Sequence, residues 1–312
     1  MQDRNFKGHA ALLVAYIIFG LNTPVAKNVL TQVDVCSPLA LTFFRLAGAG
    51  ILFWTLSIFT KKERVPPKDL LLLLGASFFG VFFNQMTFIT GLAHTSPIDA
   101  SVIVTTSPLI TMILAAFFLK EPITWKKAIG VLIGAAGALL LIFTANTTDQ
   151  KSQTTVAGIM LCLISTLSFS FYLAAFKKVI MRYSPVTLMK WMFFFAAIFG
   201  LPFCWKDVVS VQYTEIPADI LMQIIYVVAL ATFFAYLLVP VGQQLLRPTI
   251  VSMYNYLQPV VSSLVAVALG MDRFGLVKGG ATALIFIGVY VVTVSKSYAQ
   301  VVAEQERKLE KR

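Results

Sequence analysis

Four uncharged amide side chains lie inside long apolar stretches of the sequence, where hydrogen-bonding partners are scarce. They are Asn22, Asn84, Gln85 and Asn255. A buried amide costs free energy unless it is hydrogen-bonded, and polar residues in apolar helices usually face the interior of a bundle. Each amide donates and accepts hydrogen bonds, so together they could hold a polar solute without changing it chemically. We expect them either to converge on a central cavity or to form hydrogen bonds between helices.

Two prolines lie at the same depth in two further apolar stretches. Pro108 and Pro259 are each 11 residues into an expected helix, counted from Pro97 and from Pro248. At 1.5 Å per residue this depth is about 16 Å, near the middle of a hydrocarbon core about 30 Å thick. A proline frees backbone carbonyl groups that a polar cavity could satisfy. We expect both kinks to line the cavity, with Tyr172 and Tyr236 from other helices; kinks satisfied by packing are the alternative.

Charged side chains inside the apolar stretches are few. Arg45 lies about 12 Å from the outer end of its expected helix, and Asp99 lies at the outer end of another. We expect this pair to form a structural ion pair or an outer gate rather than a substrate anchor. Lys27, near the end of the first helix, is expected to extend its ammonium group outward to water.

The elements that must position these residues follow from composition. The 312 residues have a mean hydropathy of +0.82, with 58% apolar and 12% charged residues, whereas soluble domains carry about 25% charged residues. This excludes a soluble enzyme, a disordered chain and a nucleic-acid-binding module. Ten stretches are long enough to span a bilayer as helices. They are 10–26, 37–60, 70–98, 100–119, 128–148, 152–176, 185–205, 220–246, 248–271 and 279–295.

The basic residues predict how these helices are oriented. With the N-terminus inside, the cytoplasmic loops and tails contain 18 Lys and Arg residues and the opposite side contains 4. An excess of Lys and Arg marks the cytoplasmic side. We therefore expect a multi-pass protein of the inner (plasma) membrane with both termini in the cytoplasm.

An internal repeat divides the chain. Residues 91–143 align without a gap to residues 242–294, at a constant offset of 151. The alignment pairs Pro108 with Pro259 and Gly137 with Gly288. It predicts an all-α fold of two five-helix units, 8–146 and 152–297, followed by a charged cytoplasmic tail, 298–312. Because five is odd, the second unit must be inverted in the membrane, an arrangement typical of secondary transporters.

The motifs also resemble a known family. Thr95-Ser96-Pro97, Ser107-Pro108-Leu109 and the acidic loop residue Glu121 are similar to the pattern of EamA-type members of the drug/metabolite transporter superfamily. The resemblance covers essentially the whole chain as two EamA-like units. The second unit departs from it, with Asp272 in place of Glu121 and no arginine in its second helix. The resemblance implies a ten-helix exporter or permease of small metabolites and leaves the substrate open.

These observations together predict a secondary transporter of small organic metabolites such as amino acids, working by alternating access around a central cavity. The alternatives are a membrane-embedded enzyme and a non-transporting receptor or scaffold. The sequence contains no phosphate-binding loop of the Gly-Lys-Ser/Thr type and no intramembrane nucleophile–His–acid set, which argues against an ATPase and a hydrolase. We expect no enzyme activity, no cofactor and no metal.

The expected partners are a small-molecule substrate and the lipid bilayer, without nucleic acid. A small-residue stripe, Gly130-xxx-Gly134-xxx-Ala138, could pack within the bundle or mark a dimer contact, so both a monomer and a homodimer are expected alternatives. All 14 acidic residues lie in loops, in tails or at helix ends. We therefore expect gradient-driven flux rather than proton coupling, with titration of Asp99, His94 or a substrate group as the alternative.

Overall fold

The computed structural model describes residues 2–32, 35–118, 125–144, 154–245, 254–271 and 275–294, and all regular structure in these ranges is helical. The predicted unit boundaries at 146, 152 and 297 and the tail 298–312 lie outside the described residues. The predicted all-helical fold is confirmed, whereas the count of ten spans and the cytoplasmic position of the termini stay predictions.

Within the described ranges, the helices of the first unit form successive passes, of which the third contains a π-helical segment and the fourth is broken. In chain order its elements are α1 (Gln2–Thr31), α2 (Pro38–Ile58), α3 (Pro67–Ser77), η1 (Phe78–Phe82), α4 (Phe83–Ala93), α5 (Pro97–Val104), α6 (Ser107–Phe118) and α7 (Trp125–Thr144). The third pass runs through α3, η1 and α4, where η1 is a π-helical segment. The fourth pass is broken between α5 and α6.

The second unit repeats this plan. Its elements are α8 (Val156–Ala175), α9 (Lys177–Ile180), α10 (Pro185–Ser210), α11 (Ala218–Ile225), η2 (Tyr226–Phe234), α12 (Ala235–Leu245), η3 (Tyr254–Tyr256), α14 (Leu257–Ala268) and α15 (Leu276–Val294). The π-helical η2 contains residues 229–233, which are the counterparts of η1 at the offset of 151. The 3-10 turn η3 likewise occupies the place of the break between α5 and α6.

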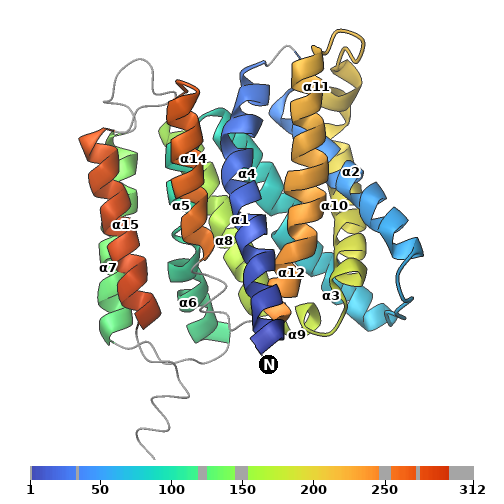
Figure 1. Cartoon of the computed structure of the whole chain (residues 1–312), viewed down its shortest axis with the longest axis horizontal. Helices are drawn as coiled ribbons and strands as arrows, with labels where there is room; N and C mark the ends of the chain where they lie inside the picture. Colours follow the sequence, from blue (N-terminus) through green and yellow to red (C-terminus); the bar gives the residue numbers. More distant parts are fainter. Residues whose placement is uncertain are drawn as a thin grey trace, which may run out of the picture.

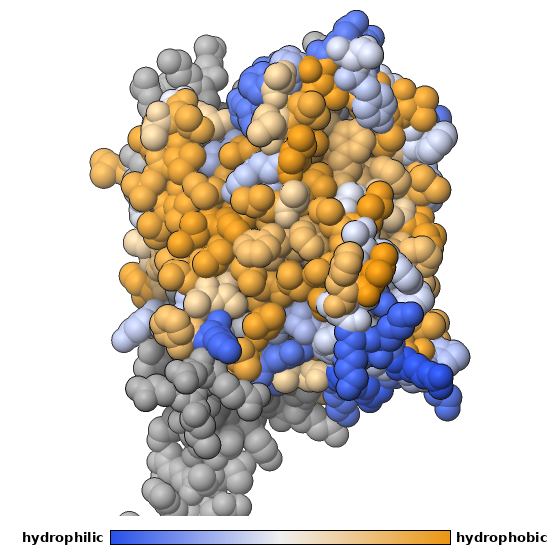
Figure 2. Space-filling model, turned by 45° about the vertical axis from the view of Figure 1, so that its right-hand side comes forward, coloured by the Kyte–Doolittle hydropathy of each residue, from blue (hydrophilic) through white to orange (hydrophobic). Residues whose placement is uncertain are grey.

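Within the described ranges, six helical segments, two of which include a π-helical stretch, are long and apolar enough to cross a membrane. They are Phe6–Thr31, Pro38–Ile58, Pro67–Ala93, Val156–Ala175, Pro185–Ser210 and Ala218–Leu245. Figure 2 shows a broad apolar band across the face in view, with hydrophilic residues gathered above and below it. Large apolar side chains such as Ile51, Leu71 and Leu264 are exposed in the described part of the chain. Such a band is suited to contact with lipid hydrocarbon rather than water.

Serine–proline pairs mark the start of three helices, α2, α5 and α10. Ser37, Ser96 and Ser184 each precede a proline at the first helical position, and each hydroxyl oxygen accepts a hydrogen bond from a backbone N–H of the first turn. A serine N-cap satisfies a backbone donor that has no partner within the helix, and proline at the next position has no N–H to satisfy. These local signals fix where α2, α5 and α10 begin.

The last helices of the two units pack against each other. Figure 1 shows α7 and α15 side by side at one end of the bundle. A Cβ atom added at Gly137 would lie 2.8 Å from the Ala281 carbonyl oxygen, and one added at Gly288 would lie 2.5 Å from the Gly130 carbonyl oxygen. The contacts run in opposite order along the two helices, so α7 and α15 are antiparallel. Because α7 and α15 are equivalent helices, their antiparallel packing shows the inversion of the second unit.

The predicted small-residue stripe of α7 is thus occupied within the bundle. A Cβ atom added at Gly288 would lie 2.5 Å from both the Gly130 carbonyl oxygen and the Gly134 backbone nitrogen. A Cβ atom added at Gly134 would in turn lie against the side chain of Leu109 in α6. Glycine allows two helix backbones to approach closely in an apolar environment. This stripe therefore does not require a second copy of the chain.

Candidate functional site

A cavity of about 120 Å³ lies where α1, α2, α4, α8, α12 and the η3–α14 segment meet. It draws side chains from both units. The lining residues among those described are Tyr16, Phe19, Asn22, Thr23, Arg45, Gly80, Asn84, Gln85, Phe88, Val104, Ser107, Ser165, Thr166, Phe169, Tyr172, Met189, Met192, Tyr236, Val239, Pro240, Gln243, Asn255 and Gln258. This volume is below the roughly 300–1,000 Å³ of sites for drug-sized ligands, so in this state the cavity has room only for a small solute.

The structure places all four amides on this cavity, but in different hydrogen-bonding states. Asn84 Nδ2 donates to the Ser165 carbonyl oxygen (2.9 Å) and hydroxyl oxygen (2.8 Å), which ties α4 to α8. Gln258 Nε2 donates to Asn255 Oδ1 at 3.2 Å. Asn22 Oδ1 and both amide atoms of Gln85 are buried without a hydrogen-bond partner among the described residues. The hydrogen-bonding capacity of these buried atoms is thus unused in this state.

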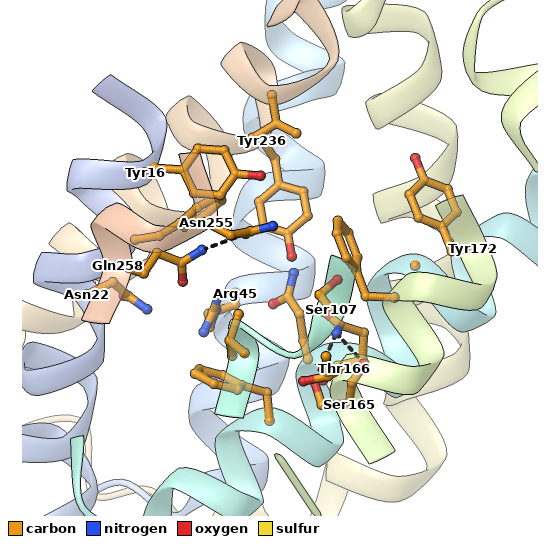
Figure 3. A pocket seen from close by; sticks show the side chains of 18 of the residues that line it. Tyr16, Asn22, Arg45, Ser107, Ser165, Thr166, Tyr172, Tyr236, Asn255 and Gln258 are labelled. Atoms are coloured by element: carbon orange, nitrogen blue, oxygen red, sulfur yellow. Dashed lines mark hydrogen bonds between the residues drawn. The ribbon is translucent and has the colours of Figure 1, made fainter. Parts of the chain in front are cut away.

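Arg45 of α2 also lines the cavity and is only 4% exposed. Its Nε donates to the Thr232 hydroxyl oxygen at 2.9 Å. That hydroxyl in turn donates to the Val227 carbonyl oxygen, five residues earlier in the π-helical η2, at 2.7 Å. The Arg45 Nη1 atom is buried without a hydrogen-bond partner in the described part of the chain. In Figure 3, Arg45 and Tyr236 project into the same space as Asn255 and Gln258.

The expected pairing of Arg45 with Asp99 is not present, since no ion pair joins them across the described ranges. Asp99 lies in the first turn of α5, where Oδ2 accepts a hydrogen bond from the Thr154 hydroxyl at 2.6 Å. Lys27 also differs from its prediction. It is 4% exposed, and its Nζ donates to the Leu92 and Ala93 carbonyl oxygens at the end of α4. Helix ends leave such carbonyl groups unpaired, which explains why the ammonium group turns inward.

The two prolines lie outside the cavity lining, contrary to expectation. Pro108 is the second residue of α6, and Pro259 is the third residue of α14. Proline is tolerated in the first turn of a helix because no intrahelical N–H bond is needed there. The chain therefore breaks before each proline instead of kinking at it. The preceding residues, Ser107 and Gln258, line the cavity at equivalent positions of the two units.

Tyr172 and Tyr236 both line the cavity, from α8 and α12. Tyr172 is 3% exposed and packs against Gly80, where an added Cβ atom would lie 2.6 Å from the ring carbon Cγ. The Tyr172 hydroxyl donates to Met192 Sδ at 3.8 Å. Gly80 belongs to η1, so this interrupted pass determines how closely the ring approaches.

Sequence reasoning did not find several lining residues. Gln258 could have been found, because it lies three residues after Asn255 and so shares its helical face. The aromatic wall formed by Tyr16, Phe19 and Phe169 had no such signal, because the chain contains 26 phenylalanines and 10 tyrosines. Aromatic side chains on an apolar helix are common whether they face lipid, core or cavity.

The described lining of the cavity carries positive charge and no negative charge. Arg45 is the one charged side chain among the described lining residues, which include no Asp, Glu or His. The remaining lining consists of amides, hydroxyls, aromatic rings and aliphatic groups. Such a cavity can bind and orient a solute, and it offers no nucleophile with an adjacent base.

Comparison with known proteins agrees with this architecture. Residues 6–143 and 156–294 each match the model of the EamA-like transporter family. An uncharacterized transporter of Archaeoglobus fulgidus is 27% identical over 261 residues, which cover 84% of this chain and 90% of that protein. An S-adenosylmethionine uptake transporter of Rickettsia prowazekii is 24% identical over 186 residues, or 60% of this chain and 59% of that protein.

A solved crystal structure shares the fold. It has a TM-score of 0.63 and 19% sequence identity, and the match covers 94% of this chain and 96% of the other. The two matched ranges of the family model correspond to the two helical units described above. This polytopic helical membrane protein therefore belongs to the EamA-like transporter family.

Proposed function

We propose that this chain is a secondary transporter of small organic metabolites such as amino acids, and that the solute binds in the central cavity. The observation that carries the proposal is the position of the cavity between two inverted units. In that position, rocking of one unit against the other could open the cavity to either side in turn. The unpaired amide atoms of Asn22 and Gln85 support a role in binding.

Export across the inner (plasma) membrane is the proposed direction and location. The excess of basic residues on one side supports a fixed orientation. The Rickettsia relative is named as an uptake transporter, so membership of the family does not set the direction. The proposed export is tested by comparing metabolite efflux from cells that express the chain with efflux from matched control cells.

Flux into liposomes that contain the purified protein then tests transport directly. Uptake of a metabolite identified in the efflux comparison should saturate with concentration and should leave the solute chemically intact. A chemically altered solute would indicate an enzyme, and binding without flux would indicate a receptor. Either result would overturn the proposal.

Uncoupled, gradient-driven flux is the proposed energetics. A proton-coupled carrier commonly places a titratable acid on its path, and none is found among the described lining residues. The test imposes a pH gradient on liposomes with equal solute concentrations inside and outside. We expect no net accumulation. Accumulation that collapses when a protonophore is added would contradict uncoupled flux, and Asp99→Asn would then be the first variant to examine.

A further inference from the structure

We propose that the cavity selects organic solutes that carry a carboxylate, and that Arg45 binds this group. The inference rests on the proposed function, because it assigns a substrate class to the same cavity. It is carried by the state of the Arg45 side chain, which is buried, lines the cavity and has no acidic partner among the described residues.

A buried cation of this kind needs a counter-charge. Transfer of an ion from water to a protein interior costs several kcal/mol unless a partner and hydrogen bonds compensate for it. Intramembrane arginines are accordingly found paired or facing a cavity. Within the described lining, no carboxylate competes for the guanidinium group. The missing negative charge is therefore assigned to the solute.

The geometry leaves part of the hydrogen-bonding capacity of the guanidinium group unused. Thr232 holds Nε at 2.9 Å, and the bond from Thr232 to Val227 fixes the hydroxyl in turn. This leaves Nη1 without a partner. Guanidinium and carboxylate groups match as planar forks that can form two parallel hydrogen bonds. Thr232 is thus a positioning residue, and Arg45 is the binding residue.

The rest of the cavity suits the remainder of such a molecule. Asn22 and Gln85 add amide groups to the same lining, and Asn22 Oδ1 has no hydrogen-bond partner among the described residues. Phe19, Phe88 and Met192 provide an apolar wall. The solute is therefore a small organic acid with an apolar body, which polar substituents could extend.

Two matched sets of probes separate charge from shape. Phenylacetate, phenylacetamide and phenethylamine form one set, and butyrate, butyramide and butylamine form the other. Binding of each probe to the purified full-length protein in detergent is measured by equilibrium dialysis with radiolabelled compounds. We expect at least one carboxylate to bind about tenfold or more tightly than its amide and its amine, since charge-assisted hydrogen bonds exceed neutral ones by this order.

Variants then assign that preference to Arg45. Arg45→Gln should reduce the ratio of carboxylate to amide binding to about one, and a thermal-shift assay in detergent shows whether the variant is folded. Arg45→Lys should keep part of the preference. Thr232→Val should lower the carboxylate-to-amide ratio without abolishing it. The matched control is Arg64→Gln, the same substitution in an exposed loop, which should change nothing.

A second variant keeps Arg45 and supplies an acidic side chain that competes with the solute for its guanidinium group. Arg45 and Gln85 both line the cavity, so Gln85→Glu would place an acid in the cavity that holds the guanidinium group. We expect this change to abolish the carboxylate preference and to favour the amines.

The inference is overturned if the probes of each set bind equally, if none binds, or if Arg45→Gln retains the preference. Liposome flux is scored separately. Carboxylate binding that depends on Arg45 without any flux contradicts transport alone, whereas flux that treats acid, amide and amine alike contradicts carboxylate selection alone.

Discussion

The amide of Asn255 has a hydrogen-bonding partner on its own helical face, and this makes its replacement informative. Asn255→Leu would leave Gln258 Nε2 without the acceptor that it contacts at 3.2 Å. A buried donor that loses its partner costs about 1–3 kcal/mol. We expect liposome flux to fall about fivefold or more, because both side chains line the cavity, while the amount of protein in the membrane changes little. Transport assays and membrane immunoblots measure the two quantities.

The control for this substitution lies on the exposed side of α14, the helix that follows η3. Val260 is 53% exposed, so Val260→Leu adds a similar side chain without touching the cavity and should leave flux unchanged. An equal loss of flux and membrane protein in Asn255→Leu would point to a purely structural amide instead.

At this scale the sequence was informative where a residue type was rare in its surroundings. Amides and an arginine are conspicuous in apolar helices, and all of those singled out line the cavity. Their partners could not be predicted, because those partners depend on packing between distant segments. Asn84 meets Ser165 across 81 positions, and Arg45 meets Thr232 across 187. The prediction that the Lys27 ammonium group extends to water is wrong for the same reason, since the carbonyl groups that it contacts end a different helix.

Interrupted helices shape the cavity at the scale of elements. Gly80, within the π-helical η1, leaves room for the Tyr172 ring, and an added Cβ atom would lie 2.6 Å from it. Gly80→Ala should push this ring toward the cavity and cost about 1–3 kcal/mol through overpacking. We expect a marked loss of flux with a modest fall in melting temperature, measured by a thermal-shift assay in detergent.

A matched substitution controls for the loss of glycine itself. Gly280 is exposed on α15, and no atom lies within 4 Å of its added Cβ position. Gly280→Ala should therefore keep both flux and melting temperature, or raise the latter slightly through better helix propensity. Unchanged flux in Gly80→Ala would show that the Tyr172 position does not matter for transport.

The apolar pattern predicted where helices run but not how they are interrupted. Six continuous spans fall on stretches identified by hydropathy, because burial in lipid demands apolar length and internal hydrogen bonding. The prolines predicted irregular backbone in the correct part of the chain, but the helix is broken before Pro108 rather than kinked at it. The π-helical η1 and η2 had no signal, since a shift of hydrogen-bond register leaves no mark on composition.

For the whole molecule, a polar cluster joins the two units on the predicted cytoplasmic side. Asp69 Oδ2 accepts a hydrogen bond from the Tyr183 hydroxyl and forms an ion pair with Arg182 Nη1 at 2.5 Å. Burial and the bond to Asp69 raise the pKa of Tyr183, and the bond and charge of Asp69 raise that of Arg182. Gln244 Nε2 also donates to the Tyr183 carbonyl oxygen. The cluster thus connects α3, the segment before α10, and α12.

Removing the charge of Asp69 should loosen this connection. We expect Asp69→Asn to lower the melting temperature of the purified protein at neutral pH, since the asparagine cannot pair with Arg182. Asp219→Asn removes another acid from a first helical turn, that of α11, but this residue is exposed. The control should show little change, and an equal shift in both variants would mean that only the helix dipole was affected.

The predicted orientation can be tested with single cysteines, because the three native thiols are buried and free. Lys61→Cys and Glu215→Cys place exposed thiols in loops that the basic-residue rule assigns to the cytoplasm and the outside, respectively. A membrane-impermeant maleimide should label Glu215→Cys in intact cells and Lys61→Cys only after permeabilisation. The reverse pattern would invert the topology.

The glycine-mediated packing of α7 on α15 has a consequence for biogenesis. About 130 residues of chain separate the end of one helix from the start of the other. A ribosome adds about 5–20 residues per second, so α7 waits roughly 7–26 s for its partner to be made. During that interval its glycine face is open to lipid or to the insertion machinery. A helix of the first unit therefore completes its packing only when α15 of the second unit has been made.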